Sequence, residues 1–521
     1  MPPGLMLSKY NVIFKEFCSN LLIRLFITSS TLKEDFDIMS VISNLEPGLV
    51  WKHFDEIRQI PRCSKHEEKI REYIVDFAKK QKLNYKVDNP GNVVISKPGT
   101  SGMEKRPTVI LQGHMDMVCE KNSDIDFDFS KDPIQLKLKD DILTADGTTL
   151  GADNGMGLAM SLAILEDNSL KHGPLEALFT VDEETGLTGA FALKSDMLTG
   201  RILLNLDSED FGVVTVGCAG GGDTKIELPF KTGTVNGDMT SLNIKVSGLR
   251  GGHSGVDIHE QRGNAVKLLT RMLWKAKDDY KFYINEIKGG DKHNAIPREA
   301  FANISLKNSE KEKFISTMKK EEKNILQEIK PIDPKFKVDF REIDKMKTIL
   351  SEESQNHLLN LLQGLPHGVD KMNYEIPNLV DTSTNLATVS INEHNIVIGM
   401  STRSSIKTAL QDLRDRIRAV ALLSGAKVEE EEPYPGWQPN LDSKALKLSK
   451  KIFKDMYNKE PVVEAIHAGL ECGIIGEKFP GMDMISIGPT IKYPHSPEEQ
   501  VHISTVDKTY NYVLKILEEI K

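Results

Sequence analysis

Short apolar segments that end in imidazole or carboxylate side chains are the feature that most constrains this chain. One of them, Thr108–Val118, reads TVILQGHMDMV and opens with β-branched and aliphatic residues, which predicts a buried strand. The strand ends at His114 and Asp116, whose side chains point the same way in an extended segment because they are two positions apart. Two interpretations stay open here: a polar pair at the surface, or a metal-ligating His114 supported by Asp116.

Two further apolar strands are predicted to end in acidic residues. Leu175–Val181 precedes Asp182-Glu183-Glu184, and Arg201–Leu206 precedes Asp207. Adjacent carboxylates repel one another unless a cation gathers them, although a solvated acidic turn explains the same letters. The second strand repeats the pattern of the first, which favours a common site over two unrelated turns.

Asp153 is expected where a turn leads into a helix. It lies in the segment GADNGMG, residues 151–157, which runs into the apolar helix Met156–Glu166. An aspartate there is explained by helix capping alone. However, ligands of α/β sheets gather outside the carboxyl ends of the strands, so one shared site is also favoured. The residues that would meet there are His114, Asp153, Glu184 and Asp207.

Length and charge narrow the class of protein. A chain of 521 residues with 39% hydrophobic and 27% charged residues is typical of a globular protein with two or three domains. The net charge of −9 provides no basic stripe, so nucleic acid is not expected as a partner. No run approaches the roughly 18 apolar residues of a membrane span, so no membrane association is expected.

The cysteines bear on the redox compartment of the protein, and the N-terminal segment bears on where the fold begins. The five cysteines are scattered and form no CxxC pair, which favours a reducing compartment and predicts neither a disulfide framework nor a thiolate zinc site. Residues 1–38 are expected to be an extension outside the fold, with a targeting segment or a downstream start at Met39 as the alternatives.

The order of predicted elements indicates an α/β domain interrupted by an inserted domain. Composition changes near Gly220–Gly222, and new strand-and-helix patterns follow, including a helix predicted over Lys345–Leu362. The acidic, proline-containing run Glu429–Pro439 is typical of a linker. We therefore expect a mixed-sheet catalytic domain formed by residues 39–220 and 438–521, and an inserted α+β lid formed by residues 221–437.

Taken together, His-x-Asp, Asp-Asn, Glu-Glu, Asp and a late His at Pro494-His495-Ser496 resemble the co-catalytic zinc peptidases. That family includes carnosinases, aminoacylases and bacterial carboxypeptidases. The runs NLEPGLVWKHFDEI, GADNGMG, GGHSGVDIH and AIHAGLECG are similar to its aminoacyl-histidine dipeptidase branch. The resemblance covers the chain from about Asn44 to the C-terminus.

The resemblance implies a dizinc site. One Zn²⁺ would be held by His114, Asp153 and Asp207, and the other by Asp153 as a bridge, Glu184 and His495. Nitrogen and oxygen ligands suit zinc, with Mn²⁺ or Co²⁺ as possible occupants. His502, in a Val-His-Ile context, is the rival to His495 for the late ligand.

Other roles are also implied by the resemblance. Glu183 would be the general base toward a metal-activated bridging water, and Asp116 would support His114. His253 on the lid would stabilise the oxyanion, and Arg403 would bind the substrate's C-terminal carboxylate. The remaining residues implied to contact substrate are Asn294, His467 and Gly469.

The implied activity is hydrolysis of dipeptides, of the Xaa-His type among others, by a cytoplasmic homodimer. Two alternatives stay open: another amide hydrolase of the family, such as an aminoacylase or tripeptidase, and a non-catalytic metal-binding relative. The second alternative predicts a broken ligand set, whereas every expected ligand and Glu183 are present in this chain.

Overall fold

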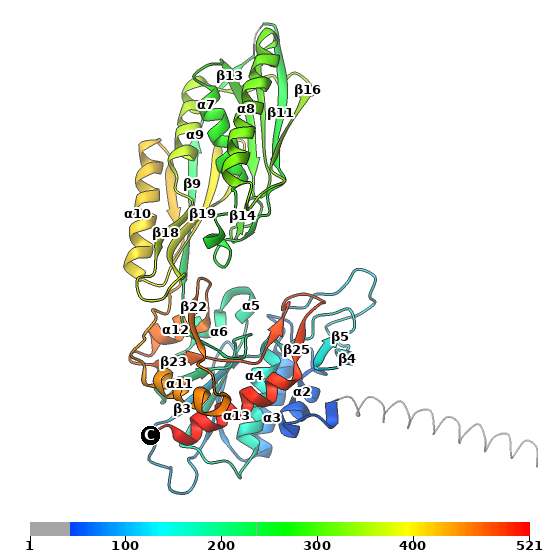
Figure 1. The fold of residues 1–521 in the computed structure, drawn as a ribbon, viewed down its shortest axis with the longest axis vertical. Helices are drawn as coiled ribbons and strands as arrows, with labels where there is room; N and C mark the ends of the chain where they lie inside the picture. Colours follow the sequence, from blue (N-terminus) through cyan, green and yellow to red (C-terminus); the bar gives the residue numbers. More distant parts are fainter. Residues whose placement is uncertain (1–41, 236) are drawn as a thin grey trace, which may run out of the picture. The chain divides into compact units, whose positions relative to one another are not determined.

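The computed structural model describes residues 42–235 and 237–521. The expected N-terminal extension, residues 1–38, lies outside the described residues. The chain divides into two compact units: unit 1 contains the described residues up to Val213 together with Leu448–Glu460 and Ser486–Lys521, and unit 2 contains Val214–Lys447 and Pro461–Ile485. Both units pack helices on β-sheets, and the predicted α/β class with mixed sheets is confirmed (Figure 1).

Five strands of unit 1 are consecutive neighbours in a mixed sheet. In spatial order they are β1 (Asn84–Val87), β2 (Val93–Lys97), β6 (Leu175–Thr180), β3 (Val109–His114) and β7 (Ile202–Asn205). β2 pairs antiparallel with β1 and β6, whereas β3 runs parallel to both β6 and β7. Every residue of β3 and β6 is buried, which explains why parallel strands read as continuous apolar runs.

The register of β3 aligns the carboxyl ends of three strands. His114 lies opposite Thr180 of β6, and Gln112 lies opposite Asn205 of β7. Because these strands are parallel, the residues that follow them emerge at one edge of the sheet. The polar ends noted in the sequence therefore belong to a single edge.

The helices of unit 1 are built around one that is buried on nearly all sides. Helix α4 (Ala152–Glu166) packs against β3, α2 (Gly48–Ile57) and α13 (Ile503–Glu519) (Figure 1). Its sequence is apolar or small all round, as expected of a helix enclosed by other elements. The other helices with residues in this unit are α3 (Glu68–Lys80), α5 (Glu183–Gly186), α6 (Thr188–Ala192) and α11 (Lys444–Tyr457).

A small sheet brings the C-terminal segment beside the start of α4. Its strands, in spatial order, are β24 (Ile491–Lys492), β25 (Gln500–His502), β5 (Ile142–Ala145) and β4 (Leu136–Lys139). β25 pairs antiparallel with β5, with Val501 opposite Leu143. The loop between β24 and β25 is thereby held close to the loop that follows β5.

Unit 2 contains a nine-stranded sheet with helices α7, α8 and α9 side by side over it (Figure 1). Its strands are β16 (Lys337–Ile343), β11 (Met239–Ser247), β15 (Ala300–Lys307), β13 (Phe282–Gly289), β19 (Val380–Ile391), β20 (Asn395–Ser404), β9 (Gly220–Pro229), β21 (Lys427–Glu430) and, paired with β19, β18 (Gly368–Met372). The helices of unit 2 are α7 (Ala265–Ala276), α8 (Lys311–Ile329), α9 (Glu352–Gly364), α10 (Lys407–Leu423) and α12 (Glu471–Lys478). The remaining strands are β8 (Val213–Cys218), β10 (Thr232–Thr234), β12 (Gly252–His253), β14 (Ala295–Ile296), β17 (Thr348–Leu350), β22 (Val462–Ile466) and β23 (Asp483–Ser486), and η1 (Ile258–Glu260) and η2 (Asn308–Glu310) are single 3₁₀ turns.

One expectation about unit 2 is wrong. The glycine run Gly220–Gly222, where the composition changes, begins the long strand β9, and its glycines lie opposite Thr402 to Ser404 of β20. The helix predicted over Lys345–Leu362 is a strand, β17, followed by the shorter helix α9. Ser351 separates them, since its backbone is extended and its hydroxyl accepts a hydrogen bond from Ser354 N, which caps the helix.

The sequence predicted no disulfide framework, but the structure contains one disulfide. Cys63 and Cys119 form a disulfide, with Cα atoms 5.7 Å apart. They are 56 positions apart, and their spacing gave no sign of pairing. The fold brings them together because Cys63 forms a parallel bridge with Met117, just beyond the end of β3.

We predict that Gly157→Ala destabilises the protein. A Cβ at this position of α4 would overlap Asn154 Oδ1 and lie 2.6 Å from the carbonyl oxygen of Leu206. Overpacking of this kind costs about 1–3 kcal/mol, so the melting temperature should fall. The control is Gly48→Ala in α2, where a Cβ would meet nothing within 4 Å. Equal melting temperatures for the two variants would contradict this account of α4 packing.

Candidate functional site

Three of the sequence-predicted residues meet at the carboxyl edge of the unit 1 sheet. His114 is the last residue of β3, and its Nε2 lies 3.2 Å from Asp153 Oδ1 and 3.3 Å from Asp207 Oδ1. Asp207 follows β7, and Asp153 lies at the start of α4. All three side chains are largely buried, so the charges face one another rather than solvent.

His495 and Glu184 complete the cluster from the other side of Asp153. His495 Nε2 lies 3.1 Å from Asp153 Oδ2 and 3.0 Å from Glu184 Oε2. Asp153 therefore presents one carboxylate oxygen to each imidazole. His114, Asp153 and Glu184 each offer an atom within 4.8 Å of the others, and Asp207 and His495 contact members of this trio.

The backbone at the start of α4 departs from helical geometry at Asp153. The dihedral angles are φ −83° and ψ 112° at Asp153, and φ −102° and ψ 34° at Asn154. Asn154 Nδ2 donates a 2.7 Å hydrogen bond to the carbonyl of Leu206, the residue before Asp207. The Asn154 side chain occupies space that a Cβ at Gly113 would fill. The candidate ligands Asp153 and Asp207 are thus linked, because the residue after Asp153 bonds to the residue before Asp207.

Asp116 anchors the turn that carries the two glutamates. Its Oδ1 accepts a hydrogen bond from Glu183 N at 3.1 Å, and its Oδ2 accepts from Glu184 N at 3.2 Å and from Ser64 Oγ at 2.8 Å. Asp116 Oδ1 also lies 3.3 Å from His114 Nδ1. One buried carboxylate therefore orients a candidate ligand and the segment bearing another.

The electrostatics of the cluster are those of carboxylates that need a cation. Burial alone would lower the pKa of His114, but the charge of Asp207 together with hydrogen bonds that the ring donates to neighbouring carboxylates holds that pKa well above its usual value. Hydrogen bonds with Asp153 and Glu184 raise the pKa of His495 to about 11. Burial raises the pKa of Asp207 to about 6. In this cluster, protons on the two imidazole rings neutralise part of the carboxylate charge. A bound metal ion would neutralise the same charge.

The donor set fits divalent metal ions. Glu184 Oε1 is buried and accepts no hydrogen bond from any described residue, whereas the buried Asp207 Oδ1 has His114 Nε2 3.3 Å away as its neighbouring donor. Buried carboxylate oxygens without donors carry a large desolvation cost unless a cation compensates them. The cluster supplies only nitrogen and oxygen ligands, with one carboxylate shared, which suits Zn²⁺, Mn²⁺ or Co²⁺.

Two buried charged residues at this site were missed by the sequence reasoning. Glu499 accepts hydrogen bonds from four successive backbone N–H groups, those of residues 150–153, and burial raises its pKa to about 7. Arg62 donates to the carbonyl oxygens of Met115, Asp116 and Gly151. The only signal for Glu499 was its place four residues after His495, and Arg62 had none, because its partners are remote in sequence.

The residues implied to contact substrate lie in unit 2. Arg403 Nη1 donates to Tyr434 Oη at 2.9 Å, while Arg403 Nε is buried without a hydrogen-bond partner among the described residues. His467 Nε2 lies 2.7 Å from Ser383 Oγ. A Cβ at Gly469 would lie 3.1 Å from the Tyr434 ring, so Arg403 and Gly469 approach the same tyrosine.

The other two are His253, the last residue of β12, and Asn294, directly before β14. His253 Nδ1 accepts hydrogen bonds from Gly255 N at 3.2 Å and Val256 N at 3.0 Å. Burial and the nearby Arg403 charge lower the pKa of His253 to about 4, so its ring is neutral near pH 7. Asn294 is exposed, and its backbone carbonyl accepts a hydrogen bond from Ser254 N. These contacts place His253 beside Asn294 within unit 2.

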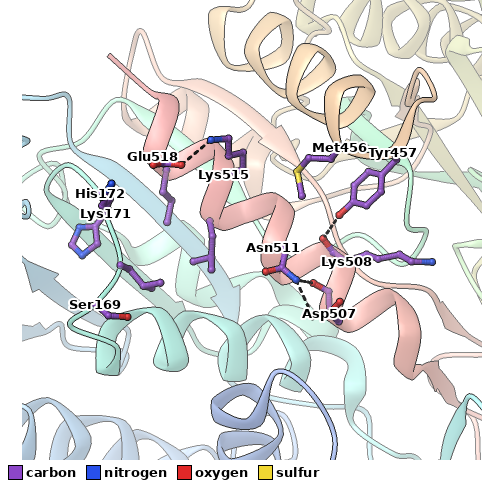
Figure 2. Close-up of a pocket in the computed structure, with 13 residues that line it drawn as sticks. Ser169, Lys171, His172, Met456, Tyr457, Asp507, Lys508, Asn511, Lys515 and Glu518 are labelled. Carbon is purple, nitrogen blue, oxygen red and sulfur yellow. Dashed lines mark hydrogen bonds and ion pairs between the residues drawn. The ribbon is translucent and has the colours of Figure 1, made fainter.

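A separate cavity of about 610 Å³ lies between α13, the end of α11 and the segment around Ser169 (Figure 2). Among its lining side chains, Lys515 donates to Glu518 and Asn511 donates to Asp507. Tyr457 donates to the carbonyl oxygen of Lys508. None of the candidate metal ligands lines this cavity, so its size does not identify it as the metal site.

Comparisons with known proteins agree with the geometry. Residues 110–519 match the model of peptidase family M20/M25/M40. The cytosol non-specific dipeptidase of Escherichia coli strain K12 is 39% identical over 482 residues, which cover 92% of this chain and 99% of that protein. The crystal structure of aminoacylhistidine dipeptidase from Vibrio alginolyticus is 40% identical with a TM-score of 0.86, covering 92% of this chain and 98% of that one. The aminopeptidase PepT structure from Bacillus cereus, at 17% identity and TM-score 0.52 over 91% and 99% of the two chains, shares the fold.

We predict that the metal-free protein loses stability as the pH rises, through His495. Since the folded state raises the pKa of His495 from 6.5 to about 11, this contribution is complete below pH 6.5 and is lost progressively above it. The side chain is half exposed, so screening limits the effect to about 1 kcal/mol. Melting temperatures of chelator-treated protein at pH 6 and pH 9 measure it.

The variant His495→Gln should show a smaller fall between these pH values than the wild type. His394→Gln, at an exposed histidine of unit 2, is the matched control and should behave as the wild type. Parallel falls in all three proteins would show that His495 does not hold the proton.

Proposed function

Because the chain belongs to peptidase family M20/M25/M40 and is a metal-dependent peptide hydrolase, we propose that it is a dizinc dipeptidase. The observation that carries the proposal is Asp153, which presents one oxygen toward His114 and the other toward His495. That geometry is what a carboxylate bridging two metal ions requires. The names of the two most similar relatives described above, both dipeptidases, support dipeptides as substrates.

In this proposal, one Zn²⁺ takes His114, Asp153 and Asp207, and the other takes Asp153, Glu184 and His495. Three carboxylates and two neutral imidazoles carry a formal charge of −3, so one divalent ion leaves the cluster anionic while two overcompensate it by one. A hydroxide would then neutralise the whole. Mn²⁺ or Co²⁺ could replace zinc with the same ligands.

The chain's own residues supply orientation and proton transfer. When bound, the two metal ions lower the pKa of a water and polarise the scissile carbonyl. Glu183 adjoins the ligand Glu184 on the turn that Asp116 holds through the two backbone N–H groups, and this neighbourhood supports Glu183 as the general base. It accepts the proton of the attacking water and passes it to the leaving amine. Asp116 acts through His114 and the turn rather than on substrate.

The inserted segment, residues 221–437, is proposed to act as a lid that supplies substrate contacts. Arg403, whose Nε has no hydrogen-bond partner among the described residues, is suited to bind the C-terminal carboxylate of a dipeptide. His253, held neutral, donates toward the developing oxyanion. Asn294, His467 and Gly469 are assigned to substrate contact on the family resemblance.

We also propose a cytosolic location and a homodimeric assembly. The first follows from the description of the Escherichia coli relative as a cytosol dipeptidase. The second follows from the family resemblance. In the part of the chain that the structure describes, no helix is long and apolar enough to cross a membrane.

The substrate class is tested with purified, zinc-loaded protein on dipeptides, tripeptides and N-acyl amino acids. Dipeptides, Xaa-His among them, should be cleaved with the highest kcat/KM, and C-terminally amidated dipeptides should be poor substrates because Arg403 would lose its carboxylate partner. Removal of metal with a chelator should abolish activity, and zinc should restore it. Preferred cleavage of tripeptides or N-acyl amino acids would favour the alternatives, and no hydrolysis at all would indicate a non-catalytic relative.

A second prediction separates the adjacent glutamates. Glu183→Gln keeps the shape of the side chain but removes the proton acceptor, so kcat should fall about 10²–10⁴-fold while zinc content stays normal. Glu184→Gln removes a charged ligand, so zinc content itself should fall. Metal analysis beside kcat on one dipeptide measures both. Near-normal kcat in zinc-loaded Glu183→Gln protein would exclude Glu183 as the base.

A further inference from the structure

Two buried residues of opposite charge join the segments that carry the candidate ligands. Arg62 lies in the loop after α2, and Glu499 lies in the loop between β24 and β25, and both are almost completely buried. Neither belongs to the ligand set, and neither was expected from the sequence. Both bind the backbone around Gly151, two residues before Asp153.

Glu499 holds the loop before Asp153 through four hydrogen bonds. Its Oε2 accepts from Leu150 N and Gly151 N at 2.7 and 2.8 Å. Its Oε1 accepts from Ala152 N and Asp153 N at 2.8 and 3.1 Å. Both oxygens are saturated by donors of a single turn, so the backbone of Asp153 itself is fixed. A neutral amide in place of the carboxylate would turn an N–H₂ group toward two of these N–H donors.

Glu499 also fixes the segment that carries His495, which lies four positions earlier. His495 has a left-handed backbone with φ 59°, and its side chain is half exposed, so packing of the ring alone does not hold it. The loop must therefore be held from elsewhere. Because Glu499 lies in the loop of His495 and binds the backbone of Asp153, it links the positions of these two residues.

Arg62 provides the corresponding link to His114. Its Nη1 donates to Met115 O at 3.1 Å and to Asp116 O at 2.7 Å, directly after His114. Its Nη2 donates to Gly151 O. The planar guanidinium thus joins the end of β3 to the same turn that Glu499 binds. Its positive charge compensates the buried carboxylates around it, and removing either charge would leave the other uncompensated.

We propose that Arg62 and Glu499 are positioning residues that hold Asp153 midway between His114 and His495. This inference rests on the proposed dizinc function. The two side chains link three ligand-bearing segments through backbone groups and do not belong to the proposed ligand set. Outer residues that orient metal ligands typically affect metal affinity by about 10–100-fold.

The test is Glu499→Gln in the full-length protein, with Glu498→Gln as the matched control. Glu498 is the adjacent glutamate; it is exposed, and its backbone N–H donates to Ser496 Oγ while its side chain makes no hydrogen bond or ion pair with the described residues. Zinc affinity is measured by competition with a chromophoric chelator, and the melting temperature of the metal-free protein is measured in parallel. Glu499→Gln should weaken zinc binding about 10–100-fold, whereas Glu498→Gln should match the wild type.

Two further variants distinguish positioning from a general structural role. Glu499→Asp keeps the charge and should recover part of the zinc affinity, and Arg62→Lys should weaken zinc binding as Glu499→Gln does. In Co²⁺-substituted protein, the visible absorption bands should change for Glu499→Gln and not for Glu498→Gln. A lower melting temperature with unchanged zinc affinity and an unchanged Co²⁺ spectrum would overturn the inference, since it would mean that Glu499 serves only the fold.

The outcomes separate this inference from the proposed function. Wild-type protein that binds zinc and cleaves dipeptides, together with Glu499→Gln protein that binds zinc equally well, overturns the positioning role alone. Wild-type protein that binds no divalent metal overturns both. If Glu499→Gln fails to fold, Glu499→Asp and Arg62→Lys carry the same measurements, and wild-type zinc affinity in both would count against the proposal.

Discussion

The structure of the site depends on one carboxylate placed between two imidazoles. Asp153 directs Oδ1 to His114 and Oδ2 to His495, although these histidines are 381 positions apart (495 − 114). A carboxylate can serve two partners in this way only if its backbone is fixed, because a rotation of the side chain would favour one partner over the other. The non-helical geometry at Asp153, the bond from Asn154 to Leu206 and the four N–H donors bound by Glu499 each restrict that backbone.

Burial of the three carboxylates carries a desolvation cost, and it makes the cluster depend on a compensating cation. Asp153, Glu184 and Asp207 bring three carboxylates into a region where water is scarce, and Glu184 Oε1 has no hydrogen-bond donor among the described residues. Protons on His114 and His495 relieve part of the repulsion in the metal-free protein, which is why the pKa values of both are raised. Divalent cations would replace those protons. The same electrostatic need thus links the stability of unit 1 to metal binding.

The mixed sheet explains how such distant residues meet. β3, β6 and β7 are parallel and in register, so His114, the Asp182-Glu183-Glu184 turn and Asp207 follow one edge. The small sheet in which β25 pairs with β5 adds the C-terminal segment to that edge. The candidate substrate residues form their own contacts in unit 2, around Tyr434 and the His253 loop. The candidate metal ligands thus lie in unit 1, and the candidate substrate residues lie in unit 2.

The sequence by itself determined the strands of unit 1 and the polar residues that follow them, because apolar runs and their ends are local patterns. It also determined the late His495, through its resemblance to a family motif. Only the tertiary structure decided the roles of Arg62 and Glu499, the pairing of Cys63 with Cys119 and the strand at Thr348–Leu350. These features depend on partners far away in the chain, and hydrophobic periodicity carries no information about which remote backbone groups a buried charge will meet.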